Sequence, residues 1–245
     1  MEEITGLFEY MVIDNRNGMA TKIQKIWRGY FIKRTNIPLV LQYARKLLLR
    51  SNIAMNDISS DGRVNSSLDE LVVVRLLQKH FGNRIVIPNA RMWYDLLIRD
   101  YTFGWVPVNI KTTTMLTNDN VGNLALCVYS YTDYEMDLRD SYQNGSMSSI
   151  LYDKLKHKRY NCSYRRDYYF LVINKKRSDE IIVNSVRGLS RITHNPHNLP
   201  FQVKWSLNRE YNYKPIQLSA RQFLTCLKKN KPTWQSQFVS DIKSL

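Results

Sequence analysis

Three polar side chains on two predicted neighbouring strands have the types and spacing for phosphodiester chemistry. Asp95 falls within WYDLLI, and Asn109 and Lys111 fall within WVPVNIK. Because side chains alternate along a strand, residues 109 and 111 share one face, and Asp95 on a paired strand can reach it. Carboxylate and amide oxygens suit Mg²⁺, and a lysine side chain can neutralise a phosphate and orient or deprotonate a water. We therefore expect a site for metal-assisted hydrolysis here.

A fourth candidate, Glu70, lies on a helix predicted to begin at Ser67 and to end at Gly82. Two interpretations of Glu70 stay open. Three positions after Ser67 it completes a capping box, which is a structural role. Alternatively, it is a second metal ligand. Asp95 interrupts an apolar strand, where an acid is costly unless it is paired or bound to a metal. Lys111 taken alone is typical of a lysine that protects a strand edge.

Sequence patterns also predict the elements that position these side chains. Short apolar runs predict strands at residues 84–87, 93–98, 105–111, 168–174, 180–186 and near 202–205. Helical spacing predicts helices at residues 39–50, 67–81, 149–160 and 220–229. This mixture favours an α/β or α+β domain. A polar linker at residues 51–67 marks the boundary between a basic helical N-terminal region, 1–60, and a main domain, 61–245.

The charge of the chain indicates a polyanionic partner. Thirty-six Lys and Arg residues against 21 Asp and Glu residues give a net charge of +15. Such an excess favours nucleic acid, although a basic surface that only maintains solubility gives the same arithmetic. The 245-residue chain has no apolar run of about eighteen residues, so we expect no membrane span. Its acidic N-terminus and three scattered cysteines predict an intracellular protein that is not secreted.

The order of these residues resembles a known nuclease motif. Asp95 followed by Asn109-Ile110-Lys111, behind a helix with Glu70, resembles the PD-(D/E)xK core, especially that of type II restriction endonucleases. Further segments resemble a subgroup of these enzymes from bacteria and large DNA viruses: PVNIK at 107–111, Asp119-Asn120 with Asn123, DYYFLV at 167–172 and NLPFQVKW at 198–205. The resemblance spans about residues 65–215. Asn109 departs from it, because the family usually has an acid there.

This resemblance implies a restriction-endonuclease-like fold, in which helices flank a central mixed sheet, here with an N-terminal helical extension. It implies a Mg²⁺-dependent, sequence-specific endonuclease acting on double-stranded DNA. Asp95 and Glu70 would hold the metal, Asn109 would assist through its amide oxygen, and Lys111 would act on water and phosphate. A homodimer is expected because each DNA strand requires its own active site. The alternative, indicated by Asn109, is a DNA-binding protein on a nuclease fold with weakened activity.

Basic and polar side chains outside the motif are candidates for DNA contacts. Lysine and arginine suit phosphates, whereas asparagine, glutamine and arginine also suit base edges in the major groove. The candidates are Asn120, Asn123, Lys158, Arg159, Arg165, Arg191, Asn198, Gln202 and Lys204. A solvated helix face and turn-forming asparagines would give the same pattern, so a structural interpretation stays open.

The N-terminal region carries a pattern of its own. Ile23-Gln24, Arg28-Gly29 and Lys33 match the IQ motif, which binds calmodulin or related light chains in other proteins. A basic amphipathic helix offers an apolar stripe and cations to such a partner. A third hypothesis is therefore a calmodulin-binding interaction protein that acts through residues 19–34. Basic helices that lie on DNA or pack on their own domain show the same pattern.

Overall fold

The computed structural model describes residues 37–51, 53, 62–88, 92–121, 123–138, 146–195, 200–229 and 236–245. The chain divides into two units, residues 1–36 and 37–245, and every element named below belongs to the second. The IQ-like segment at 19–34 and the candidate Asn198 lie outside the described residues.

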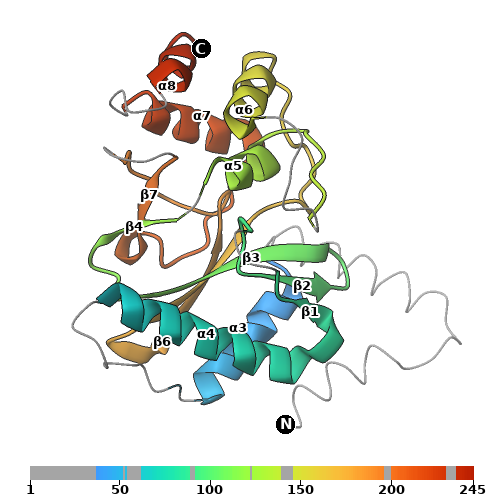
Figure 1. Ribbon diagram of the computed structural model, residues 1–245, viewed down its shortest axis with the longest axis vertical. Helices are drawn as coiled ribbons and strands as arrows, with labels where there is room; N and C mark the ends of the chain where they lie inside the picture. The colour runs from blue at the N-terminus through green and yellow to red at the C-terminus, as the bar shows by residue number, and fades with distance from the viewer. Residues whose placement is uncertain are drawn as a thin grey trace, which may run out of the picture. The chain divides into compact units, whose positions relative to one another are not determined.

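A five-stranded mixed sheet lies at the centre of the second unit (Figure 1). In spatial order its strands are β1 (Ile85–Val86), β2 (Leu96–Asp100), β3 (Gly104–Thr113), β5 (Tyr169–Asn174) and β6 (Arg177–Ser185). Strands β3 and β5 pair in parallel, and the other neighbours pair antiparallel. A separate antiparallel pair joins β4 (Asn118–Asn120) to β7 (Gln202–Lys204). The predicted α/β class is confirmed, and each predicted strand has a counterpart.

Helices cover the sheet from both sides (Figure 1). On one side lie α3 (Leu39–Ser51) and α4 (Gly62–Phe81). On the other lie α5 (Leu124–Tyr131), α6 (Met147–Lys156), α7 (Ile216–Leu227) and α8 (Ser236–Lys243). Two short 3₁₀ helices, η1 (Gly82–Arg84) and η2 (Trp205–Leu207), complete the described elements. None of the helices that the structure describes combines the length and apolar character needed to cross a bilayer.

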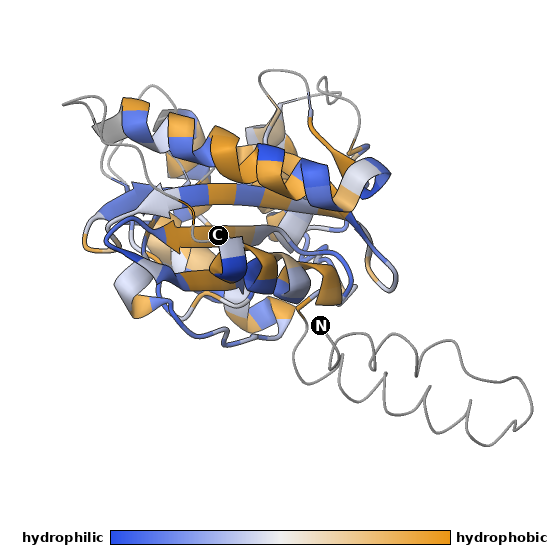
Figure 2. Cartoon of the chain, turned by 90° about the horizontal axis from the view of Figure 1, so that it is seen from below, coloured by the Kyte–Doolittle hydropathy of each residue, from blue (hydrophilic) through white to orange (hydrophobic). Residues whose placement is uncertain are grey.

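Apolar residues of both helical layers pack against the sheet. Helix α3 buries Val40, Leu41, Ala44 and Leu48, which recur at helical spacing along one face. On the opposite side, Phe170 and Val172 of β5 share a core with Tyr131 and Phe223, whose rings stack at 4.6 Å. In Figure 2, hydrophobic and hydrophilic residues alternate along the helices, as expected for helices that have one face on the core and one in solvent. Since β5 is covered on both faces, all six of its residues are buried.

The structure corrects two predicted boundaries near the candidate site. Helix α4 begins at Gly62, so the predicted start at Ser67 is wrong. Its first turns are fixed to β3, because Ser66 Oγ donates to Thr112 O and Thr112 Oγ1 donates to Ser66 O. The sequence predicts a hairpin turn around Arg99-Asp100 between the strands at 93–98 and 105–111, whereas the β2–β3 turn of the structure lies at 101–103. The side chain of Asp100 stabilises this turn, because its Oδ1 accepts hydrogen bonds from Thr102 N and Phe103 N.

The described unit also begins earlier than the predicted boundary near residue 60. It starts at Ile37, because α3 packs against the sheet. Asp100 Oδ2 accepts a hydrogen bond from Val40 N at 3.0 Å, close to the first turn of α3. Arg45 Nε donates to Ile181 O at 2.6 Å and so joins the middle of α3 to β6. Residues 37–51 therefore belong to the sheet-containing unit.

Candidate active site

The candidate site lies where β3 extends beyond its partner β2. The β2–β3 register ends with Leu96 opposite Val108, so the following part of β3 has an open edge on that side. Lys111 lies on this part of the strand, and its Nζ is 3.4 Å from Glu70 Oε1 of α4. The two side chains expose 24% and 23% of their surface. A substrate can therefore reach this ion pair without any rearrangement of the core.

Glu70 has no capping role in the structure. Helix α4 begins at Gly62, so Glu70 lies in its third turn, far from the first-turn position of a capping box. Burial raises the pKa of Glu70, and the ammonium of Lys111 lowers it in part. The carboxylate of Asp95 raises it further. Glu70 is therefore a carboxylate that interacts with both Lys111 and Asp95, and the capping interpretation is wrong.

Asp95 is fixed beside the open edge of β3 by two hydrogen bonds. Its backbone N–H donates to Val108 O at 3.0 Å, which extends the β2–β3 ladder by one residue. Its Oδ2 accepts a hydrogen bond from Ile110 N at 2.7 Å. Burial raises the pKa of Asp95, while the ammonium of Lys111 and the Ile110 N–H lower it. The structure thus brings Asp95, Glu70 and Lys111 into one electrostatic neighbourhood.

The side chain of Asn109 presents an unpaired oxygen at this position. Tyr168 donates its single hydroxyl hydrogen to Trp93 O at 2.8 Å. It can therefore only accept from Asn109, with which it is also hydrogen-bonded. This assigns the NH₂ of the amide to Tyr168. The buried Oδ1 finds no hydrogen-bond partner among the residues that the structure describes. A buried carbonyl oxygen without a partner is costly, so this atom is suited to a ligand.

Asp119 on β4 is a neighbour of this group that sequence reasoning did not place there. The ammonium of Lys111 lowers its pKa, which shows that the two charges interact. Burial has the larger effect and raises the pKa of Asp119, whose buried Oδ2 has no hydrogen-bond partner among the described residues. The sequence grouped Asp119 only with a polar cluster downstream. No local pattern could reveal its position, which depends on the long-range pairing of Asp119 with Val203.

Two oxygen donors near Lys111, the carboxylate of Asp95 and Oδ1 of Asn109, are of the chemical type that suits a hard divalent cation. No group of three or more His, Cys, Asp and Glu side chains within the described ranges is arranged to hold a metal ion. A cation here would therefore depend on Asp95 and on the unpaired Oδ1 of Asn109. Oxygen ligands of this kind suit Mg²⁺. Glu70, which is paired with Lys111, and Asp119 are further carboxylates near this group.

The three amide side chains among the predicted DNA contacts that the structure describes all have internal partners. Asn120 Oδ1 accepts hydrogen bonds from Asn195 Nδ2 at 2.7 Å and from Gln202 Nε2 at 3.1 Å. Asn123 caps helix α5, because its Oδ1 accepts from Ala125 N and from the next backbone N–H. The structural interpretation therefore accounts for Asn123, whereas a base contact through Asn120 Oδ1 or Gln202 Nε2 would have to exchange an existing bond.

The other predicted contacts lie on several surfaces. Lys158 is exposed, with a backbone φ of 55° that lysine rarely adopts. Arg159 Nε donates to Asp133 Oδ2 at 2.9 Å. Arg165 is exposed and its guanidinium lies over the ring of Tyr164. Exposed Arg191 and half-buried Lys204 complete the set. These side chains do not gather with Lys111 into one contiguous cluster of contacts.

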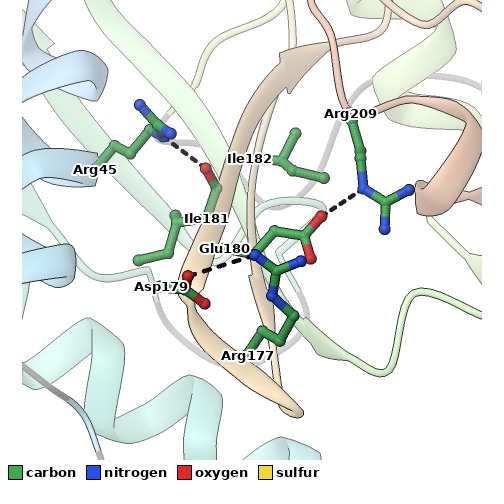
Figure 3. A pocket seen from close by; sticks show the side chains of 7 residues that line it. All are labelled: Arg45, Arg177, Asp179, Glu180, Ile181, Ile182 and Arg209. Atoms are coloured by element: carbon green, nitrogen blue, oxygen red, sulfur yellow. Dashed lines mark hydrogen bonds and ion pairs between the residues drawn. The ribbon is translucent and has the colours of Figure 1, made fainter.

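A cavity of about 350 Å³ lies elsewhere, along the edge strand β6 (Figure 3). Its charged side chains are engaged with one another or with the backbone: Arg177 pairs with Asp179, Arg209 pairs with Glu180, and Arg45 donates to Ile181 O. Charged side chains on an edge strand discourage pairing with another chain. We interpret this cavity as part of a protected sheet edge, and none of the predicted site residues lines it.

Comparison of the chain with protein-family models and with curated proteins found no significant match.

Proposed function

We propose that this chain is a Mg²⁺-dependent endonuclease of the restriction type that hydrolyses double-stranded DNA at specific sequences. The observation that carries the proposal is the group at the open edge of β3. There Lys111 pairs with Glu70, interacts with Asp95 and shares its strand with the unpaired oxygen of Asn109. The order of an acid-bearing helix, Asp95 and the Asn-Ile-Lys strand supports the resemblance to PD-(D/E)xK nucleases.

In this proposal, the chain's own side chains bind the substrate and handle the proton. The ammonium of Lys111 donates hydrogen bonds to a phosphate oxygen and to the attacking water. Glu70 accepts the proton that this water loses, because burial raises its pKa and so makes it a stronger base. The water oxygen then bonds to phosphorus, the bond to the leaving deoxyribose oxygen breaks, and that oxygen takes up a proton from solvent.

The metal has a defined place in this proposal. Asp95 would hold Mg²⁺ through its carboxylate and Asn109 through its amide oxygen. Glu70, the proposed proton acceptor, interacts with Asp95. When bound, Mg²⁺ supplies electrostatic stabilisation of the negative charge that develops on the phosphate. Because an amide carries no charge, we expect weaker metal binding than at a site with a second carboxylate in place of Asn109.

Charge supports DNA as the substrate. The net charge of +15 attracts a polyanion and makes its binding depend strongly on salt. To cut both strands of a duplex, two copies of the chain would act as a homodimer. In the proposed enzyme a monomer would nick plasmid DNA, whereas a dimer would linearise it. Light scattering of the free protein, alongside the cleavage products, would distinguish the two.

The test is digestion of supercoiled plasmid with and without Mg²⁺. The wild-type protein should give discrete fragments only with Mg²⁺, and Lys111→Ala should lose cleavage by at least a hundredfold, as catalytic charges usually contribute. Lys176→Ala is the matched control, because Lys176 is exposed in the β5–β6 turn. If Lys111→Ala cuts like the wild type, the proposed role of Lys111 is wrong.

Asn109 favours one alternative, a DNA-binding protein with weakened catalysis. This alternative predicts a salt-sensitive gel shift of duplex DNA without cleavage. It also predicts that Asn109→Asp restores cutting, since the new carboxylate would add negative charge beside Asp95. Absence of cleavage by both the wild type and Asn109→Asp, with either Mg²⁺ or Mn²⁺, would exclude the nuclease proposal. The calmodulin-binding hypothesis concerns residues 19–34, outside the described residues.

A further inference from the structure

Arginine and aromatic side chains gather at the other end of β3, remote from Lys111. The set, named here the arginine–aromatic patch, consists of Arg99, Tyr101, Phe103, Trp105, Tyr164 and Arg165. Trp105 and Lys111 are six residues apart on one strand, which corresponds to about 20 Å. The patch is therefore separate from the proposed active site and shares no residue with it.

Two segments that are distant in sequence meet in this patch. The β2–β3 turn at 101–103 supplies Phe103, whose ring meets that of Tyr164 edge to face at 6.2 Å. The guanidinium of Arg99 lies 6.0 Å from the centre of the Trp105 ring. The guanidinium of Arg165 lies 5.4 Å from the centre of the Tyr164 ring. Phe103 is buried, whereas Arg99 and Arg165 are exposed, so both guanidinium groups are accessible at the surface.

Tyr101 gives the patch an unusual feature, because it is 91% exposed. A large aromatic ring so exposed contributes almost nothing to the core, so its position calls for another explanation. The turn that carries it is fixed, since Asp100 Oδ1 accepts hydrogen bonds from Thr102 N at 2.8 Å and Phe103 N at 3.1 Å. The ring of Tyr101 therefore projects from an ordered support.

The other segment of the patch is ordered as well. Asn161 Oδ1 accepts a hydrogen bond from Ser163 N, and Ser163 Oγ accepts one from Arg165 N. Arg187 also donates to Ser163 O at 2.8 Å. These bonds fix the backbone beneath Tyr164, which is 38% exposed. Both aromatic supports are thus arranged before any ligand arrives, which lowers the entropy lost on binding.

The charge of the patch is positive. Residues 96–105 and 160–168 are described throughout, and their two acids, Asp100 and Asp167, are both buried. Asp100 accepts three backbone hydrogen bonds, and Asp167 interacts with the guanidinium of Arg187. No exposed carboxylate in these two segments therefore offsets Arg99 and Arg165.

We propose that the arginine–aromatic patch binds a single-stranded stretch of nucleic acid. Arginines that contact phosphates, beside exposed aromatic rings on which bases stack, are the combination that such strands require. A duplex fits less well, because its bases are already stacked on each other and expose no faces to Tyr101. The shared chemistry is that of unpaired bases on a phosphate backbone, which DNA and RNA both provide.

The test is fluorescence anisotropy with labelled twenty-nucleotide probes of thymidine and of uridine. Tyr101→Ala should weaken binding about tenfold, since a base–aromatic stack contributes about 1–3 kcal/mol. Tyr101→Phe keeps the ring and should bind like the wild type. Leu116→Ala is the control for an exposed apolar side chain, because Leu116 is 60% exposed outside the patch. A loss with only one of the two probes would identify that polymer as the ligand.

Two further probes separate stacking from charge. An abasic oligomer with the same number of phosphates should bind the wild type at least tenfold more weakly than the thymidine probe. A twenty-base-pair duplex should bind Tyr101→Ala and the wild type alike. The proposal is overturned if Tyr101→Ala leaves binding of both single strands unchanged, if the abasic oligomer binds equally well, or if the duplex shows the same loss.

This proposal can fail or succeed independently of the nuclease proposal. Lys176→Ala, which removes an exposed charge in the β5–β6 turn, should leave binding of the single-stranded probes unchanged. Plasmid cleavage does not enter the measurement, so a protein that cuts no DNA would still give a clear result at the patch. Conversely, an active nuclease whose Tyr101→Ala variant binds single strands normally would refute only the patch.

Discussion

Asp167 provides a test of how burial and charge are balanced in the described unit. Its carboxyl group is buried, and it accepts hydrogen bonds from Tyr168 N at 2.8 Å and Arg187 N at 3.3 Å. Burial raises the pKa of Asp167 from an ordinary value of 3.8 to about 6, although the guanidinium of Arg187 lowers it in part. The folded protein therefore holds a proton on Asp167 at pH values where the unfolded chain has released it.

The sign and size of the effect follow from this difference. Between pH 4 and pH 6 the folded state binds more protons than the unfolded state, so the free energy of unfolding falls as pH rises. A pKa difference of about two corresponds to roughly 3 kcal/mol. The amide side chain of Asp167→Asn cannot titrate. The free energy of unfolding of this variant should therefore fall less between pH 4 and pH 6 than that of the wild type. At pH 7 the full effect is present in the wild type.

Urea unfolding at half-unit steps from pH 4 to pH 7 would measure this difference. Asp179→Asn is the control, because Asp179 has an exposed side chain. The wild type and Asp179→Asn should lose about 3 kcal/mol more than Asp167→Asn over this range. Parallel profiles for Asp167→Asn and the wild type would show that burial does not dominate at Asp167, and the reasoning from burial would be refuted.

Three other substitutions have expected outcomes. Gly188→Ala should lower the free energy of unfolding by about 1–3 kcal/mol, because a Cβ there would lie 2.5 Å from Asn184 Oδ1 and from the Tyr211 ring; a neutral change in urea unfolding would contradict this. Asn123→Ala should cost about 1 kcal/mol as a lost helix cap and leave duplex DNA affinity unchanged. If Asn123→Ala instead lost duplex DNA affinity but no stability, the predicted base contact of Asn123 would be supported. Asp95→Asn should stabilise the metal-free protein at pH 7, since burial raises the pKa of Asp95 and its ionised form is therefore disfavoured. Lower stability of Asp95→Asn in thermal unfolding at pH 7 would contradict that reasoning.

The sequence predicted the sheet well because its strands are apolar runs between turn residues. YFLVIN, for example, forms β5 with every residue buried. Helix α8 was not predicted, because its eight residues carry few apolar side chains and short helices give a weak periodic signal. The start of α4 was misplaced for a different reason. Ser67 and Glu70 reproduce a capping pattern by chance, whereas contacts of Ser66 with β3 extend the helix to Gly62.

The candidate site was predictable only where local rules apply. Alternation along β3 placed Asn109 and Lys111 on one face, and pairing with the preceding strand placed Asp95 beside them. Asp119 could not be placed, because the β4–β7 pair joins segments more than eighty residues apart. The arginine–aromatic patch likewise depends on a tertiary contact, that of Phe103 with Tyr164. Long-range pairing is invisible to periodicity and motif spacing.

The most direct test of the proposed metal site is a crystal of the protein soaked in Mn²⁺ and measured at the manganese absorption edge. We expect one anomalous peak within coordinating distance of the Asp95 carboxylate and of Asn109 Oδ1, and no such peak in Asp95→Asn. A peak at another place, or an Asn109 oxygen that binds only a protein group, would contradict this expectation.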